Sequence, residues 1–206
     1  MEKRNNYQIQ AAQAKKLFLE YDQIQLTEKF HLRADETYLY PVLFGRQYRI
    51  HRKTGEMQWH QDGQWRDGNS FHEVLTMMDL LCDSREDRFL SGKWKNMTAF
   101  GNQFHQNLME DEKDPFAMEI QTRPEAFRKA CEALGGTSVS GADIAYSFPV
   151  FDGLPLALFF WEGDEEFPAA SQILFSSNFP AAFSAYDLTE IVEIILGVMK
   201  EKGVQK

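Results

Sequence analysis

Residues 154–161, Leu-Pro-Leu-Ala-Leu-Phe-Phe-Trp, form an apolar run in which neither set of alternate positions is polar. Because successive side chains of a strand point to opposite faces, the run predicts a central strand that is covered on both sides. Its short length, its aromatic content and Pro155 favour a strand over a buried helix. The acidic stretch 162–166 and the apolar segment 171–175 then predict the turn and the return strand of a hairpin.

Residues 36–66 show a second strand pattern, in which Tyr38 and Tyr40 alternate with Leu39. Turn-forming pairs divide this pattern into strands. Gly45-Arg46 fits a type II′ hairpin turn, and Asp62-Gly63 fits a type I′ turn. The segment therefore predicts an antiparallel meander.

Apolar residues recur at helical spacing from Tyr7 to Tyr21, which predicts an amphipathic helix that packs on the chain's own sheet or on a partner. A second helix is predicted behind Ser70. The Ser70 hydroxyl and the Glu73 carboxylate have the spacing of a capping box, in which each side chain accepts from the backbone N–H of the other residue.

Thr122 and Glu125 have the same spacing and predict a further capping box, with a helix that ends at Gly135-Gly136. The last helix is predicted to open at Asp187. Together the patterns predict an α+β fold, an antiparallel sheet in two meanders with capped helices packed against it. The length fits a single α+β domain over residues 1–206, with a subdomain division near 84–122 left open.

Composition and charge narrow the classes of partner. The net charge is −9, and nucleic-acid binding needs a concentrated basic face, so we expect no nucleic-acid partner. No run approaches the ~20 apolar residues of a membrane span, and the polar N-terminus leads into no apolar signal segment. We therefore expect a soluble, acidic, cytoplasmic protein with no membrane partner.

The chain has two cysteines, Cys82 and Cys131, and each falls on the apolar stripe of a predicted helix. Buried, reduced thiols are expected. Two cysteines are too few for an all-cysteine zinc site or an iron–sulfur cluster, so no cofactor is predicted. The five histidines have no metal-binding spacing, and no residue is assigned as a metal ligand.

The strongest concentration of chemical groups is the acidic turn, with carboxylates at Glu162, Asp164, Glu165 and Glu166. Clustered oxygen ligands suit Ca²⁺ or Mg²⁺, so one interpretation is a cation site. The other is a solvated hairpin tip, where like charges cost only about 1 kcal/mol per pair in water. The sequence leaves both interpretations open.

Three segments resemble an uncharacterised prokaryotic family, a domain of unknown function associated mainly with anaerobes. They are Phe44-Gly-x-x-Tyr-x-Ile50, Leu134-Gly-Gly136 with Ala142-Asp-Ile-Ala145, and the stretch from Leu154-Pro-Leu to Trp161-Glu-Gly-Asp-Glu-Glu-Phe-Pro-Ala169 with Ile173-Leu-Phe175. The resemblance runs from about residue 36 to the C-terminus. Some longer relatives carry a cysteine-rich segment that this chain lacks. The family implies no established activity and no catalytic residues.

We interpret the sequence as that of a non-enzymatic binding or accessory protein whose partner is a small molecule or a protein. The candidate ligand-binding cleft is lined by Asp143, Trp161, Asp164, Glu165 and Glu166. The alternative is a divalent-metal-dependent enzyme that uses the last three of these carboxylates. An oligomerisation module built on the stripe from Tyr7 to Tyr21 is the third hypothesis.

Overall fold

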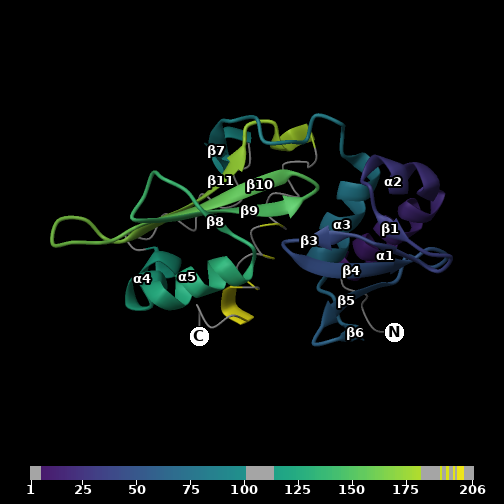
Figure 1. Cartoon of the computed structure of the whole chain (residues 1–206), viewed down its shortest axis with the longest axis horizontal. Coiled ribbons are helices and arrows are strands. Elements are labelled where there is room, and N and C mark those ends of the chain that lie inside the picture. The colour runs from purple at the N-terminus through teal and green to yellow at the C-terminus, as the bar shows by residue number, and fades with distance from the viewer. Residues whose placement is uncertain are drawn as a thin grey trace.

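Two antiparallel sheets, one from each half of the chain, lie along the long axis of the molecule (Figure 1). The computed structural model describes residues 6–100 and 114–181, and near the C-terminus residues 191, 194, 197 and 199–201. The start of the helix predicted from Asp187 lies outside the described residues. The two sheets and their helices confirm the α+β class.

The N-terminal sheet is a meander with the strand order β1-β2-β4-β5-β6, and β3 pairs with the first part of β4. Its strands are β1 (Arg33–Ala34), β2 (Tyr38–Tyr40), β3 (Val42–Leu43), β4 (Arg46–His51), β5 (Met57–Gln61) and β6 (Gln64–Arg66). Pairing places Ile50 opposite Leu39 and Met57, and all three are buried. These side chains form the inner face of the sheet.

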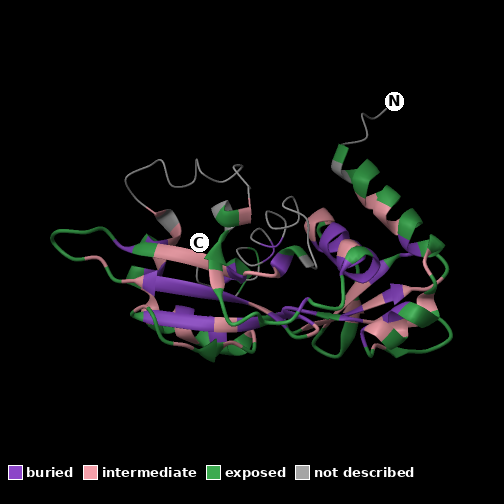
Figure 2. Cartoon of the chain, turned by 90° about the horizontal axis from the view of Figure 1, so that it is seen from above, coloured by how far each residue is buried: buried purple, intermediate pink, exposed green. Residues whose placement is uncertain are grey.

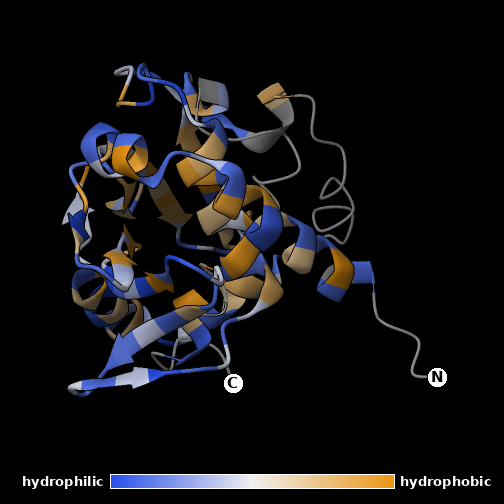
Figure 3. Cartoon of the chain, turned by 90° about the vertical axis from the view of Figure 1, so that its right-hand side faces the viewer, coloured by the Kyte–Doolittle hydropathy of each residue, from blue (hydrophilic) through white to orange (hydrophobic). Residues whose placement is uncertain are grey.

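Helices α1 (Asn6–Glu20) and α3 (Phe71–Asp83) lie together on the inner side of the N-terminal sheet (Figure 2). The capping box of Ser70 and Glu73 is present at the start of α3, as the sequence predicts. The short helix α2 (Gln23–Lys29) was not predicted, and the Asp22 carboxylate caps it by accepting from Ile24 N. Figure 3 shows apolar positions, in orange, on α1, the helix that leads to the N label. Leu17 of this helix is exposed.

The C-terminal sheet has the strand order β7-β11-β10-β9-β8. Its strands are β7 (Trp94–Asn96), β8 (Thr137–Ser138), β9 (Ile144–Phe151), β10 (Leu154–Trp161) and β11 (Ala170–Ser176). Strands β8 to β11 form the second meander, and β7 joins its edge beside β11. Its helices in the described part of the chain are α4 (Pro115–Thr122) and α5 (Pro124–Ala133), with 3-10 turns at Met97–Phe100 and Phe179–Ala181.

Strand β10 is buried on both faces, as its apolar run predicts. Leu156, Leu158 and Phe160 face the main core, whereas Ala157 and Phe159 belong to a smaller cluster on the other side. The loop before β9 covers this second side: an added Cβ at Gly141, whose φ is +124°, would meet the Phe159 ring at 2.7 Å. The close approach explains why glycine stands in this loop.

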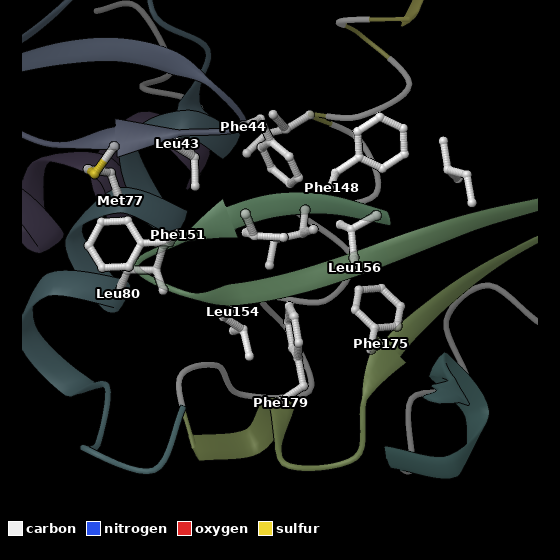
Figure 4. Packing of buried hydrophobic residues seen from close by; sticks show 14 of the residues in the cluster. Leu43, Phe44, Met77, Leu80, Phe148, Phe151, Leu154, Leu156, Phe175 and Phe179 are labelled. Carbon is white, nitrogen blue, oxygen red and sulfur yellow. The ribbon is translucent and has the colours of Figure 1, made fainter. Parts of the chain in front are cut away.

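One hydrophobic core joins the two halves of the molecule (Figure 4). Leu43 and Phe44 from the N-terminal half meet Phe148 and Phe151 of β9, and Phe44 N donates to Val150 O at 2.9 Å. The backbone bond and the apolar contacts fix the two sheets relative to each other.

Arg88 also links the two halves of the molecule, through a buried charge. Its guanidinium donates to Lys29 O at 3.2 Å, forms an ion pair with Asp152 in the β9–β10 turn, and stacks over Phe30 at 4.6 Å. The side chain is 2% exposed. A buried charge is tolerated when it is paired and hydrogen-bonded, as the terminal nitrogens of this arginine are, although its Nε has no partner among the described residues.

Two local predictions were wrong. Thr122 ends α4 and donates to Glu119 O at 2.9 Å, and α5 begins after Arg123 without a side-chain cap. A residue inside the preceding helix cannot adopt the extended conformation of an N-cap. The hairpin turn also lies one residue earlier than predicted, because Phe44 and Gly45 have φ values of 50° and 70°, which fits type I′ rather than II′.

Candidate functional site

The outer face of the N-terminal sheet carries aromatic and cationic side chains. Strand pairing places Tyr38 beside His51, Arg49 beside Gln58, and Trp65 beside His60. All of these side chains are half-buried. We call this surface the Arg–aromatic face; its members are Arg33, Tyr38, Tyr40, Arg49, His51, Gln58, His60 and Trp65.

The planar groups of the face stack on one another. The Arg49 guanidinium carbon lies 4.4 Å from the Tyr38 ring centroid and 4.7 Å from that of Trp65. The Arg33 guanidinium lies 3.9 Å from the Tyr40 ring, which is itself 5.9 Å from Trp65. Each cation–π contact contributes about 0.5–1 kcal/mol at an exposed site. The stack therefore holds both guanidinium groups in fixed orientations at the surface.

The hydrogen bonds of Arg49 leave most of its donors available. Its Nε donates to Gln58 Oε1 at 2.7 Å, and Gln58 Nε2 donates to Asp67 Oδ1 at 2.8 Å. Within the described part of the chain, the terminal Nη atoms of Arg49 have no hydrogen bond or ion pair. The terminal donors of this stacked arginine thus have no carboxylate partner among the described residues.

The nearby carboxylate of Asp35 is engaged by uncharged donors. Tyr38 N and Thr37 N donate to Oδ1 at 2.7 and 2.8 Å, and the Tyr40 hydroxyl donates to Oδ2 at 2.6 Å. The Tyr40 hydrogen bond, followed by the two backbone bonds, lowers the pKa of Asp35, and Arg33 adds a smaller charge effect. Asp35 therefore orders the edge of the face without forming an ion pair with Arg33 or Arg49.

This arrangement suits recognition of an anion. An arginine fork matches the geometry of a carboxylate or phosphate, and each charge-assisted hydrogen bond is about twice as strong as a neutral one. The half-buried rings around the fork offer apolar contact area and reduce the competition from water. The face can therefore bind a segment that combines acidic and apolar side chains.

The predicted site at the β10–β11 hairpin is only partly assembled. The Asp143 carboxylate accepts from Glu162 N at 2.8 Å, so it lies at the base of the hairpin. Trp161 is half-buried, and its ring packs against Phe159 with centroids 5.9 Å apart. Asp143 and Trp161 thus support the hairpin.

The carboxylates of the turn spread over an exposed tip, green in Figure 2. Asp164 Oδ1 accepts from the backbone N–H groups of Glu166 and Phe167, both at 2.8 Å, and these bonds lower the pKa of Asp164. Glu165 and Glu166 are exposed, and Phe167 is 68% exposed. In the described ranges, no three or more His, Cys, Asp or Glu side chains come together in a group suited to a metal ion.

A buried polar network links β4 to the start of α3. Glu73 Oε1 accepts from the Tyr48 hydroxyl at 2.6 Å and from Arg46 Nη1 at 3.2 Å. Its Oε2 accepts from Ser70 N at 2.8 Å, so one carboxylate completes the cap and holds the sheet. Burial, then the charge and hydrogen bond of Glu73, raises the pKa of Tyr48 far above its usual value. The Tyr48 hydroxyl therefore stays a donor at all ordinary pH values.

A groove of about 680 Å³ runs between α1 and the start of α3. Its residues include Ala11, Lys15, Glu56, Asn69 and Phe71. Lys15 Nζ forms an ion pair with Glu56 Oε2 at 2.8 Å, which joins α1 to the β4–β5 turn beside the groove. The groove is therefore bounded by a contact that the fold itself uses.

Both cysteines are buried and free, as predicted. Burial raises the pKa of Cys82 to about 12 and that of Cys131 further still. Because the thiolate is the reactive form, burial and the raised pKa both lower the reactivity of these thiols. Of the helices that the structure describes, none is long and apolar enough to span a membrane.

Sequence reasoning missed the Arg–aromatic face. It considered the histidines only for metal-binding spacing and did not group His51 and His60 with the arginines of the same sheet. The sequence carried one signal for this face, the alternation of inward and outward positions along each strand. Once the outward set of positions is chosen, Tyr38, Tyr40 and Arg49 all belong to it.

A family model described as a domain of unknown function (DUF3786) matches residues 22–197. The match covers most of the chain, so the chain belongs to this family, in agreement with the resemblance seen in its motifs. No curated protein and no solved structure matches the chain.

Proposed function

We propose that this member of the DUF3786 family is a non-enzymatic binding or accessory protein that recognises an acidic partner segment through the Arg–aromatic face. The observation that carries the proposal is the environment of Arg49. Its guanidinium is stacked between Tyr38 and Trp65, and among the described residues only its Nε has a hydrogen-bond partner. Such a group can bind a carboxylate without first giving up an internal partner.

The local charge balance supports the same proposal. The chain as a whole carries −9, yet this face presents Arg33 and Arg49. The Asp35 carboxylate at the edge of the face accepts hydrogen bonds from Tyr40 and two backbone N–H groups. Guanidinium groups with unused donors can pair with the carboxylates of an acidic partner, which favours such a partner over a basic one.

The hairpin belongs to the proposal as a second recognition element. Asp143 and Trp161 hold its base, and Asp164, Glu165 and Glu166 present carboxylates at its tip. The alternative of a divalent-metal enzyme would need these carboxylates to converge, and their exposure on a turn favours binding instead. We also propose a cytoplasmic setting, which the two unpaired, buried cysteines support.

A fluorescence polarisation titration with a labelled polyglutamate peptide tests the proposal. We expect the wild type to bind, with an affinity that falls as salt rises. R49Q should weaken binding about tenfold, equivalent to about 1.4 kcal/mol, because it removes a charge-assisted fork. R49K keeps the charge and should retain only part of the affinity, because lysine has no planar fork.

R85Q is the matched control, because Arg85 is an exposed arginine outside the face and its loss changes the net charge equally. It should bind the peptide as the wild type does. Equal affinity of R49Q and the wild type would refute the Arg–aromatic face as the recognition surface.

A further inference from the structure

The tip of the β10–β11 hairpin has the properties that the Arg–aromatic face is suited to bind. We define the acidic tip as residues 162–167. Its carboxylates are exposed, and Phe167 is the most exposed large apolar side chain in the described part of the chain, at 68%. An exposed phenylalanine beside carboxylates is unfavourable in water and favourable against rings and guanidinium groups.

The acidic tip cannot reach the Arg–aromatic face of its own chain. The hairpin projects from one end of the long axis, and strands β1 to β6 lie at the other end (Figure 1). We propose that the acidic tip of one copy binds the Arg–aromatic face of a second copy of this chain. This inference rests on the proposed function, because it names the acidic partner as a second copy.

The chemistry of the two surfaces is complementary. The carboxylates of Glu165 and Glu166 can accept charge-assisted hydrogen bonds from the guanidinium groups of Arg33 and Arg49. Phe167 has apolar partners in the half-buried rings of the face. Val42, which is 48% exposed, points to the same side because it pairs with Gln47, two residues before Arg49.

The acidic tip is already ordered before it binds. Asp164 accepts from two backbone N–H groups, and Asp164 N donates to Phe167 O at 2.9 Å. Gln121 of α4 bonds to Gly163 through both its amide atoms, at 3.3 Å each. Little conformational entropy is then lost on association, which favours binding by a small contact area.

The two surfaces lie toward opposite ends of the long axis. The proposed complex is therefore a pair of antiparallel copies related by a two-fold axis, in which the tip of each copy meets the face of the other. Such an arrangement closes on itself as a dimer, whereas a parallel head-to-tail contact would continue into a chain.

Sedimentation velocity of the full chain tests the proposal. At about 100 µM, which populates even a weak complex, the wild type should sediment as a dimer that dissociates on dilution and at high salt. The tip variant E165K/E166K and the face variant R33E/R49E should each be monomers. An equimolar mixture of the two variants should associate again, because each reversed charge then meets an opposite one.

The control variant E20K/E28K reverses two exposed carboxylates on α1 and α2 and changes the net charge by the same amount as the tip variant. It should still form the dimer. A wild type that is monomeric at about 100 µM, a tip variant that associates like the wild type, or a mixture that stays monomeric would each overturn the proposal.

Polyglutamate binding separates this proposal from the one it rests on. If the wild type binds polyglutamate through Arg49 but stays a monomer, the face recognises an acidic partner other than a second copy. If the wild type forms a dimer that R33E/R49E also forms, the tip does not use the face, and the inference fails.

Discussion

Replacing Glu73 with alanine should lower the free energy of unfolding by about 3–5 kcal/mol. The Tyr48 hydroxyl, in a side chain that is 1% exposed, loses its acceptor, at a cost of about 1–3 kcal/mol. The start of α3 loses the reciprocal half of its capping box, worth about 1 kcal/mol. Arg46 loses one carboxylate but keeps Glu201, which limits that part of the loss.

A double-mutant cycle with Tyr48→Phe isolates the central contact. In the wild-type background this change should cost about 1.5–3 kcal/mol, because it removes a buried hydrogen bond to a charged group. In the Glu73→Ala background the same change removes a hydroxyl that has no acceptor, so it should be neutral or stabilising. The coupling energy should therefore be about 1.5–3 kcal/mol.

Urea unfolding of the four proteins, analysed as a two-state transition, measures these free energies. Tyr40→Phe is the control, because its hydroxyl also donates to a carboxylate at 2.6 Å but at an exposed site where water replaces the bond. It should cost well under 1 kcal/mol. Additivity of Tyr48→Phe and Glu73→Ala to within about 0.5 kcal/mol would show that the buried bond is not made.

Three further outcomes are expected. Phe159→Ala should cost about 3 kcal/mol in the same urea assay, since the ring is buried against Gly141, and a loss under about 1 kcal/mol would mean that this side of β10 is open to water. Cys82, whose pKa burial raises to about 12, should react with a thiol reagent at pH 8 only as fast as the protein unfolds; rapid labelling of the native state would contradict its burial. The backbone hydrogen bonds that Asp164 accepts lower its pKa, so they stabilise the folded protein fully above about pH 4. This stabilisation is lost as the pH falls through the pKa of Asp164 in the folded protein. An NMR titration of Asp164 with a midpoint at or above about 3.9 would refute the ordered tip.

Local patterns were enough to predict several elements. The run from Leu154 to Trp161 forms β10, because a strand that is apolar at every position can only be stable when both its faces are covered. The capping box at α3 was predictable because Ser70 and Glu73 satisfy each other within one helical turn. Both features depend only on residues that are close in the sequence.

The same local reasoning failed where a neighbouring element decides the outcome. Thr122 has the spacing of an N-cap, but α4 runs up to it and fixes its backbone as helical. Helix α2 has only seven residues, too few for a periodic pattern, and its Asp22 cap was the one available signal.

The candidate site shows the same division. Asp143 does meet the hairpin at Glu162, a contact between neighbouring strands that the meander implied. The Arg–aromatic face needs the register of five strands, β1, β2, β4, β5 and β6, before Arg49 can be placed between Tyr38 and Trp65. Tyr38 and Tyr40 also alternate with the buried Leu39, so an apolar scale assigns both faces of β2 to the core. Pairing with β4, which sets Tyr38 opposite His51, places the tyrosines on the outer face.

The central claim is that an acidic partner binds on the Arg–aromatic face, and the indole N–H signals of the tryptophans in an NMR titration with polyglutamate test it most directly. Trp65 lies on the face and contacts Arg49, whereas Trp94 and Trp161 lie on the distant C-terminal sheet. The Trp65 signal should shift in a saturable, salt-sensitive manner while that of Trp94 stays in place, and R49Q should abolish the shift. A shift of the Trp161 signal without one of Trp65 would contradict the claim.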